Sequence, residues 1–443
     1  MKRKVSGRLS WWVPLTLRCQ LLTVMPQESR HLLRSTSPPN LYEIPMTTRK
    51  PLFAGVLVVA LMPGTLPASP SFEQCISDIR ARAVQENVAP DVADHVLGRV
   101  EHLDRVIELD RRQPEFTTSF TEYLNRRVTA QRILQGRAML HQHRDLLERV
   151  QAETGVPPAY LVAFWGLETN YGSYFGQTSV PSALATLACD PRRGEYFTGE
   201  LIAALRIIEE GSISLERMEG SWAGAMGHVQ FMPSVFLRYA VDGDGNGRRD
   251  LWNSIPDAMM SAGNFLNSLG WDPDYRWGRE VLLPEGFDYS LAGRTTRKPL
   301  SEWRRAGITD VHGQPVDDSE LPAALLVPAG HKGPAFLIYP NFNVIMRWNR
   351  SEFYALSVGH LADRIAGGGR LHTPPPGNIP RMSRDQVVRL QSTLNEKGFD
   401  SGEADGILGP ATRSAISRYQ QATGMIADGF PSETLLGKLG IDM

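Results

Sequence analysis

One carboxyl group follows a long uncharged stretch of the chain. Residues 157–167 carry no charge, and residues 160–165 are apolar on every face, which predicts a helix buried on all sides. Glu168 comes directly after this stretch. Burial and the negative end of the helix both favour the protonated form of its side chain, and a carboxyl group that holds its proton at neutral pH can serve as a general acid. The alternative is a structural glutamate that pairs with an arginine or with the backbone.

A second segment, residues 221–234, is suited to a neutral polar ligand. It contains no acidic residue, lysine or arginine, but it offers Ser221, Gln230 and the backbone around its glycines. Glycine lets a backbone approach a ligand closely, and Phe231 and Met232 can present apolar surface to the face of a sugar ring. A tight turn between two helices is the alternative.

Oxygen-bearing residues alternate after residue 241 as they do in a calcium-binding loop. Asp242, Asp244 and Asn246 occupy its first, third and fifth positions, and Arg248 offers a backbone carbonyl at the seventh. The twelfth position holds asparagine instead of glutamate, and the nearest later acid is Asp257. We therefore expect weak binding of a structural calcium ion, with an unoccupied Asp/Gly turn as the alternative.

The elements that position these residues are mainly helical. Apolar residues from Val92 to Leu103 recur at a spacing of three to four, which predicts a helical domain that begins near Ser71. Between residues 281 and 345, short runs at 324–327 and 336–339 predict small strands among the helices. The expected fold class is therefore mainly α (α+β), with a small β insertion.

Glycine and proline clusters mark a domain boundary late in the chain. Residues 367–369 are all glycine and residues 374–376 are all proline, which predicts a linker at 367–382. Ser383 then has the residue type of a helix N-cap, and apolar positions at helical spacing follow it. We expect a small helical module over residues 383–441.

The first 68 residues are expected to be absent from the mature protein. Two basic residues, the uncharged apolar run 51–61 and the small residue Ala68 follow the order of a signal peptide, which we assign to residues 46–68. The run is too short to cross a hydrocarbon core of roughly 30 Å, and a buried helix is the alternative. Residues 1–45 are interpreted as a mis-annotated extension ahead of a start at Met46.

Export has consequences for the rest of the chain. Residues 1–68 hold nine of the 47 Lys and Arg but only two of the 48 Asp and Glu, so the remainder is acidic and unsuited to non-specific nucleic-acid binding. Loss of Cys19 leaves Cys75 and Cys189 in an oxidising compartment, where we expect a disulfide. Two unpaired thiols are the alternative, because spacing alone does not bring the Cα atoms within roughly 4.4–6.8 Å. The bulky, charged residues 72–74 before Cys75 argue against a lipoprotein.

The glutamate and its neighbours also carry a resemblance. The run W-G-L-E-T-N-Y-G at residues 165–172 resembles the catalytic signature of the family-B lytic murein transglycosylases. Residues 181–197, 221–234 and 341–351 are similar to further segments of that family in the same order. The resemblance implies a lysozyme-like catalytic domain over residues 72–366.

This resemblance assigns residues to a glycan-binding cleft. It implies that Arg192 and Arg193 face the substrate and that Ser221 and Gln230 contact the muramic acid and its acetamido groups. It also implies that Asp257 closes the calcium loop.

Aromatic and amide positions of the cleft follow from the same matching. Tyr123 and Asn349 match a tyrosine and an asparagine of the family's cleft. Phe265 and Trp348 stand where the family often has tyrosine, so they keep an aromatic surface but lose a hydroxyl group. An aromatic residue such as Phe265 is more often part of a core than of a site.

The C-terminal module carries a second resemblance. Residues 404–412, A-D-G-I-L-G-P-A-T, are similar to a run in the common three-helix peptidoglycan-binding domain. The module is therefore expected to bind the bacterial wall, with a vestigial spacer as the alternative.

The family resemblance implies a reaction with one glutamate and no cofactor. Glu168 would protonate the glycosidic oxygen between N-acetylmuramic acid and N-acetylglucosamine. As a carboxylate it would then deprotonate the muramoyl C6 hydroxyl, which attacks C1 of its own ring. A 1,6-anhydromuramoyl end results without water, and the nucleophile gains from proximity.

Three alternatives stay open at this point. A hydrolytic muramidase would need a second carboxylate such as Asp190 or Glu195. A non-catalytic wall-binding recruiter and a calcium-regulated adhesin are the others. The expected partner is the peptidoglycan strand of the periplasm, for a soluble exported protein without a membrane span; enzymes of wall synthesis are left open as protein partners.

Overall fold

The structure is a computed structural model that describes residues 71–112, 118–377 and 381–442. The extension predicted at 1–45 and the signal peptide predicted at 46–68 lie outside these residues. The described residues belong to one compact unit of the chain. None of the helices within them is long and apolar enough to cross a membrane.

Helices dominate the described residues and short strands lie among them, which confirms the expected fold class. The helices are α1 (Phe72–Gln85), α2 (Pro90–Leu97), α3 (Asp104–Arg112), α4 (Phe120–Arg127), α5 (Ala130–Gln142), α6 (Arg144–Thr154), α7 (Pro158–Thr169), α8 (Val180–Ala188), α9 (Gly194–Glu209), α10 (Pro233–Tyr239), α11 (Ile255–Ser268), α12 (Leu300–Arg305), α13 (Pro340–Trp348), α14 (Glu352–Ile365), α15 (Arg384–Glu396), α16 (Pro410–Ala422) and α17 (Glu433–Lys438). The strands are β1 (Thr178–Ser179), β2 (Glu219–Gly220), β3 (Gly278–Val281), β4 (Arg297–Pro299), β5 (Pro322–Leu326) and β6 (Ala335–Ile338).

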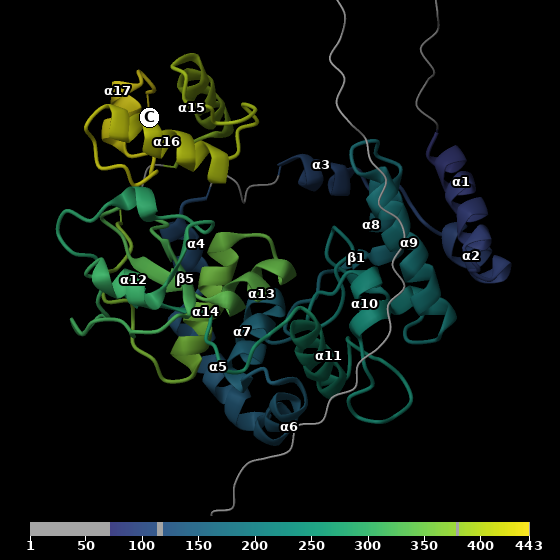
Figure 1. Cartoon of the computed structure of the whole chain (residues 1–443). Helices are drawn as coiled ribbons and strands as arrows, with labels where there is room; N and C mark the ends of the chain where they lie inside the picture. Colours follow the sequence, from purple (N-terminus) through teal and green to yellow (C-terminus); the bar gives the residue numbers. More distant parts are fainter. Residues whose placement is uncertain (1–70, 113–117, 378–380, 443) are drawn as a thin grey trace, which may run out of the picture. The chain divides into compact units, whose positions relative to one another are not determined.

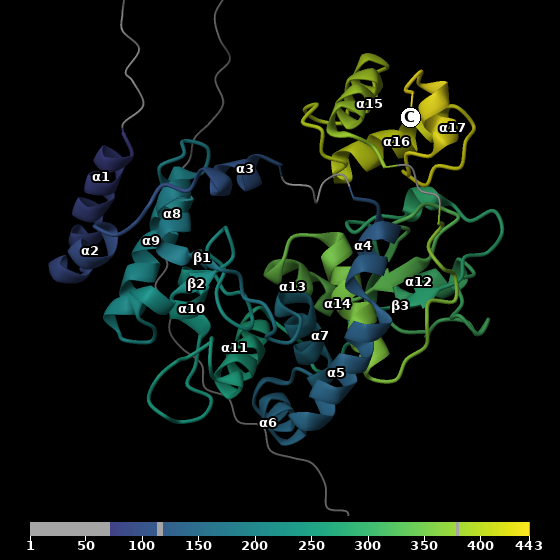
Figure 2. The ribbon, with the colours of Figure 1, turned by 180° about the vertical axis from the view of Figure 1, so that it is seen from behind.

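Helix α7 carries Glu168 in its last turn and is the predicted buried helix. All its residues from Tyr160 to Leu167 are buried. Helices α5, α6, α11 and α14 pack around it (Figures 1 and 2). The helix ends because Asn170 and Tyr171 adopt left-handed backbone angles, with φ of 50° and 61°. Glu168 therefore lies where a fully covered helix stops.

The short strands form two antiparallel sheets. Strands β1 and β2 pair alone, and the other sheet has the order β3-β6-β5-β4, in which Leu325 lies opposite Leu337. This second sheet confirms the strands expected at 324–327 and 336–339, shifted by one or two residues. It has a small core of its own, which includes Trp303, Leu325 and Leu337.

The residues from Ser383 onward form a small helical module that consists of α15, α16 and α17. Ser383 accepts a hydrogen bond from the backbone of Gln386, and the Gln386 side chain returns a bond to the backbone of Ser383, which makes a capping box for α15. Leu390, Ile416 and Leu435 lie in the module's separate core.

A disulfide joins the first helix to the rest of the structure. Cys75 on α1 and Cys189 at the end of α8 are bonded, with their Cα atoms 5.9 Å apart. This is the pairing that the sequence favoured. The loop that follows Cys189 carries Arg192 and Arg193, so the bond fixes the start of a segment expected to meet the ligand.

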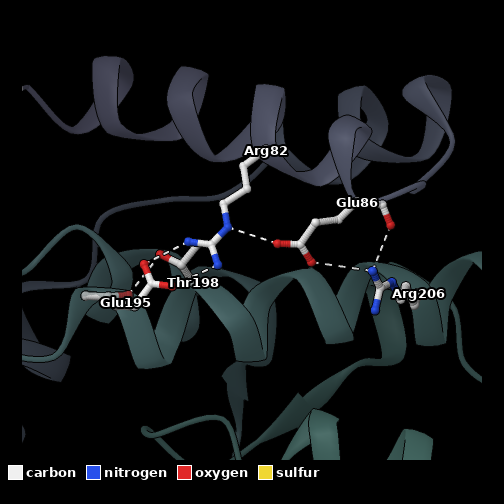
Figure 3. A network of polar contacts seen from close by, with 6 residues as sticks. Arg82, Glu86, Glu195, Thr198 and Arg206 are labelled. Atoms are coloured by element: carbon white, nitrogen blue, oxygen red, sulfur yellow. Dashed lines mark hydrogen bonds and ion pairs between the residues drawn. The ribbon is translucent and has the colours of Figure 1, made fainter.

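Charged side chains join α1 to α9. Arg82 on α1 donates to both carboxylate oxygens of Glu195 at 2.8 Å and to Glu86 at 2.9 Å (Figure 3). Arg206 on α9 donates to the backbone carbonyl of Glu86 at 2.8 Å. Exposed ion pairs of this kind contribute little stability each, so we attribute to the network chiefly the orientation of α1 on α9.

Candidate active site

Glu168 is held by two uncharged donors that attach to the same carboxylate oxygen. The indole nitrogen of Trp348 donates to Glu168 Oε1 at 3.0 Å. The hydroxyl of Tyr354 donates a short hydrogen bond to the same atom. Because the side chain of Glu168 is only partly buried, solvent or a ligand can still reach it. The carboxyl group is thus fixed in orientation but accessible.

Tyr354 is a functional residue that the sequence analysis missed. It lies on α14, among apolar residues, and is 4% exposed. Burial, followed by the neighbouring Glu168, raises the pKa of its hydroxyl well above the usual value. The hydroxyl therefore stays protonated and acts as a donor. A tyrosine hydroxyl in a largely apolar helical segment needs a partner, and this is the sequence signal that could have indicated it.

An aromatic cluster fixes the position of Trp348. The ring centroid of Trp348 lies 4.4 Å from that of Phe164, 5.4 Å from Phe231 and 5.3 Å from Phe265. Phe231 is 2% exposed and Phe265 is 8% exposed. This burial corrects the expectation that Phe231 presents surface to a sugar, because its ring supports Trp348 from inside. Met232, next in the chain, is only partly buried.

The last turn of α7 also contacts an arginine from α4. Arg127 lies with its guanidinium 5.3 Å from the ring centroid of Tyr123. The same group donates to the backbone carbonyl of Leu167 at 3.4 Å. Carbonyls in the last turn of a helix lack partners within the helix, so Arg127 satisfies one of them beside Glu168. Tyr123 is 8% exposed and packs against Phe353, which orders this wall of the site.

The glycine-rich segment forms a tight, internally bonded turn. Ser221 Oγ accepts a hydrogen bond from the backbone of Ala225 at 3.0 Å. The Gln230 side chain donates to the carbonyls of Phe175 and Gly227, both at 3.1 Å. Gln230 has a φ of 50°, an uncommon angle for a residue other than glycine. The polar groups expected to meet a ligand are thus preorganised on a strained backbone.

A buried histidine ties this segment to α7. Trp165 donates from its indole nitrogen to His228 Nδ1 at 3.0 Å, and Thr169 donates to the carbonyl of His228 at 2.8 Å. Burial lowers the pKa of His228 to about 4, so its ring is neutral at pH 7 and can accept the bond from Trp165. The glycine-rich segment and Glu168 are therefore held in one frame.

The two predicted ligand-facing arginines share one buried acid. Arg192 pairs with Asp110 at 3.2 Å, and Arg193 makes a closer contact with the other oxygen of Asp110. Asp110 is 4% exposed, whereas both arginine side chains are close to half exposed. Asp110 orients the two guanidinium groups and leaves them open to solvent.

The other polar residues considered for the site are bonded to neighbouring residues. Asn349 ends α13 and accepts a hydrogen bond from the backbone of Ser351 at 3.2 Å. Asp190 pairs with Arg111 at 3.4 Å, and Glu195 takes part in the network with Arg82. Asp190 and Glu195, the carboxylates considered for a hydrolytic reaction, are therefore both engaged in ion pairs.

The acidic loop brings three carboxylates together. One oxygen from each of Asp242, Asp244 and Asp257 lies within 4.8 Å of the others. Asp257 is fully buried and accepts backbone hydrogen bonds from Gly243 at 2.8 Å and Asp250 at 2.7 Å. A set of hard oxygen donors on a turn fits the chemistry of calcium.

The remaining predicted members of the loop organise its backbone. The Asn246 side-chain oxygen accepts a hydrogen bond from the backbone of Arg248 at 2.9 Å. Backbone bonds, first from Gly247, lower the pKa of Asp242, so this carboxylate stays charged.

Sequence profiles of two families match the chain. The family described as "Transglycosylase SLT domain" matches residues 71–363, and the family described as "Putative peptidoglycan binding domain" matches residues 383–439.

Individual relatives extend this finding. Membrane-bound lytic murein transglycosylase B of Escherichia coli is 32% identical over 286 residues, which is 61% of this chain and 76% of that protein. The crystal structure of SltB3 from Pseudomonas aeruginosa, solved with NAG-anhNAM-pentapeptide, is 45% identical and superposes with a TM-score of 0.81, covering 84% of this chain and 99% of that one. The Escherichia coli enzyme Slt35 in complex with calcium is 31% identical with a TM-score of 0.57, over 66% of this chain and 92% of that one.

The contacts around His228 predict that two glycine substitutions will lower the free energy of unfolding by different amounts. Gly172 and Gly211 both have a φ of +78°, but a Cβ at Gly172 would lie 2.3 Å from the His228 ring, whereas nothing lies within 4 Å at Gly211. Gly211→Ala should cost about 1 kcal/mol of unfolding free energy through backbone strain alone. Gly172→Ala should cost about 3 kcal/mol, because it also displaces His228. Urea unfolding measures both, and equal losses would contradict the proposed frame.

Proposed function

The chain belongs to the SLT transglycosylase family and is a lytic transglycosylase that acts on peptidoglycan, and we propose that Glu168 is its single general acid and base. The observation that carries this proposal is the bonding of Glu168. Two uncharged donors, Trp348 and Tyr354, occupy Oε1. These two bonds fix the orientation of the carboxyl group at the end of α7, as a general acid and base requires.

The reaction that follows needs no second carboxylate. Glu168 donates its proton to the glycosidic oxygen between N-acetylmuramic acid and N-acetylglucosamine. The resulting carboxylate, still held by Trp348 and Tyr354, accepts the proton of the muramoyl C6 hydroxyl as that oxygen attacks C1 of the same ring. The glycosidic bond breaks, a C1–O6 bond forms and a 1,6-anhydromuramoyl end is released. An intramolecular nucleophile of this kind needs no water and gains from proximity.

The ion pairs of Asp190 and Glu195 support this route over hydrolysis. A hydrolytic enzyme would require one of them to act as a nucleophile or a base. Each is instead bonded to an arginine, Arg111 and Arg82 respectively.

Partly exposed polar groups around Glu168 supply the glycan contacts in this proposal. Ser221 and Gln230 meet the acetamido groups, and Arg192 and Arg193 bind the anionic substituents of the strand. The further contacts are assigned to Tyr123, Met232, Trp348 and Asn349, with Phe231 and Phe265 acting as the support behind Trp348.

The acidic loop is proposed to hold a structural calcium ion. Asp242, Asp244, Asn246 and Asp257 would supply side-chain oxygens, and Arg248 would supply its carbonyl. The charge of the ion would offset the repulsion among the three clustered carboxylates. It would take no part in the chemistry, which needs no cofactor.

We further propose that the protein works in the periplasm. A signal peptide at 46–68, a catalytic domain at 72–366, a linker at 367–382 and a wall-binding module at 383–441 make up the proposed organisation. The match of the peptidoglycan-binding profile to residues 383–439 supports the last of these. Wall-synthesis enzymes are candidate protein partners of such an enzyme.

Replacing Glu168 tests the proposed chemistry. In Glu168→Gln the amide has no proton to give, so release of soluble muropeptides from purified sacculi should fall by about 10²–10⁴-fold. Glu195→Gln is the matched control, because it removes the rival carboxylate and should keep the activity. Mass spectrometry of the products from protein that begins at Ser69 should show anhydromuramoyl ends for the wild type. Full activity in Glu168→Gln, or reducible ends, would overturn the proposal.

Removing the Tyr354 hydroxyl should change the pH profile. Without this donor the charged form of Glu168 is less favoured, so the catalytic acid keeps its proton to higher pH. The alkaline limb of kcat/KM for Tyr354→Phe should move up by about 1 pH unit. Tyr239→Phe makes the same chemical change on α10 and should leave the limb in place. An unmoved limb in Tyr354→Phe would show that the bond does not control protonation.

Calcium should stabilise the protein through Asp257. At a Ca²⁺ concentration about 100 times Kd, the unfolding free energy should rise by about 2.7 kcal/mol. Asp257→Asn should lose this increment, whatever its stability without the ion. Asp310→Asn is the control, since Asp310 accepts backbone bonds in a similar turn without belonging to the cluster. The increment is read from thermal unfolding with Ca²⁺ and with chelator, and its persistence in Asp257→Asn would contradict the assignment.

A further inference from the structure

A cavity of about 540 Å³ lies between the catalytic domain and the C-terminal module. Its walls come from the start of α4, the turn before α14, the end of β5, the start of α16 and the loop at 427–431. The cavity lies close to the catalytic site, because the ring of its wall residue Phe353 packs against Tyr123 in the wall of that site, with ring centroids 6.0 Å apart. Ligand pockets typically measure about 300–1,000 Å³, so this cavity can take a small molecule or a short peptide.

The two walls are joined by a buried aspartate. Asp428 of the C-terminal module accepts hydrogen bonds from the backbone and ring nitrogens of His331, at 2.9 Å and 2.6 Å. Gln420 donates to its other oxygen at 2.8 Å. Gly330, beside His331, has a φ of +71° and lies so close to Phe430 that a Cβ would come within 2.8 Å. The contact is therefore close and specific.

Arg413 on α16 is the one feature of the cavity that these contacts do not explain. Its guanidinium lies 5.9 Å from the ring centroid of Phe353. Within the part of the chain that the structure describes, it makes no hydrogen bond or ion pair. The two carboxylates that act on it electrostatically are engaged elsewhere: Glu352 with Arg294 at 3.1 Å, and Asp428 with His331.

A partly buried guanidinium without a hydrogen-bond partner is costly. Burial lowers the pKa of Arg413, yet the group stays charged because the ordinary value is so high. It offers five N–H donors, and a buried charge is normally compensated by an anion. The rest of the lining includes apolar side chains such as Met382, Leu408 and Phe353. A matching ligand combines a carboxylate with short apolar groups.

We propose that this cavity is a subsite for the peptide stem on the muramoyl residue, and that Arg413 binds a carboxylate of that stem. The inference rests on the proposed function, since it takes peptidoglycan as the ligand. A stem peptide carries free carboxylates and small alkyl side chains, and it is attached to the sugar ring whose bond is cleaved beside Glu168. The subsite distinguishes glycan strands that bear peptides from bare glycan strands. Residues of both the catalytic domain and the C-terminal module contribute to it.

Binding to the full chain tests the proposal without turnover. In the Glu168→Gln background, calorimetry compares NAG-NAM-pentapeptide with the same disaccharide without its peptide. Arg413→Met should weaken binding of the pentapeptide compound by about tenfold or more, because a charge-assisted hydrogen bond is lost. Binding of the bare disaccharide should not change. Arg418→Met, an exposed arginine on the same helix, should alter neither.

Two further outcomes separate the possible failures. Arg413→Lys keeps the charge and should retain part of the preference for the peptide-bearing ligand, which covers the case in which Arg413→Met does not fold. Equal losses for both ligands would mean that Arg413 only docks the module, and unchanged affinities would mean that it binds nothing; either result overturns the proposal. Cleavage of the ligand by the Glu168→Gln protein would count against the proposed mechanism and not against the subsite.

Discussion

The structure depends on one constraint: a carboxyl group must be held rigidly at the end of a helix that is covered on every side, and must still be reached by a ligand. Helix α7 meets the first part, because its residues before Glu168 are buried. The left-handed backbone at Asn170 leaves Glu168 accessible to a ligand, because the chain turns away immediately after the helix. Much of the described catalytic domain can be understood as the covering that this helix requires.

The helices around α7 also supply the side chains that bond to Glu168. Helix α14 packs on α7 and contributes Tyr354, while the end of α13 contributes Trp348. The indole nitrogen of Trp348 is the donor to Glu168, and its ring is held by three aromatic neighbours. These ring contacts fix the direction in which the indole N–H points.

Patterns among neighbouring residues predicted much of this arrangement. The features that could not be predicted depend on contacts between residues far apart in the sequence. The uncharged run before Glu168, the strands near 324 and 336 and the cap at Ser383 could be predicted because periodicity and cap chemistry are local. Tyr354 could not, since its partner lies 186 residues earlier and the residues around it have the composition of an ordinary buried helix. The burial of Phe231 was missed for a similar reason, because a sequence motif does not tell which face of a ring is covered. Likewise, no local signal links His331 to Asp428, 97 residues later.

One carboxyl group is proposed to break the glycosidic bond without water, and digestion of purified sacculi in H₂¹⁸O, followed by mass spectrometry of the new chain ends, tests this mechanism. We expect muramoyl ends that carry no ¹⁸O and that resist borohydride reduction, because the oxygen at C1 comes from C6 of the same ring. Ends that contain ¹⁸O and can be reduced would mean that water is the nucleophile. A second carboxylate would then be required, and the single-glutamate account would be wrong.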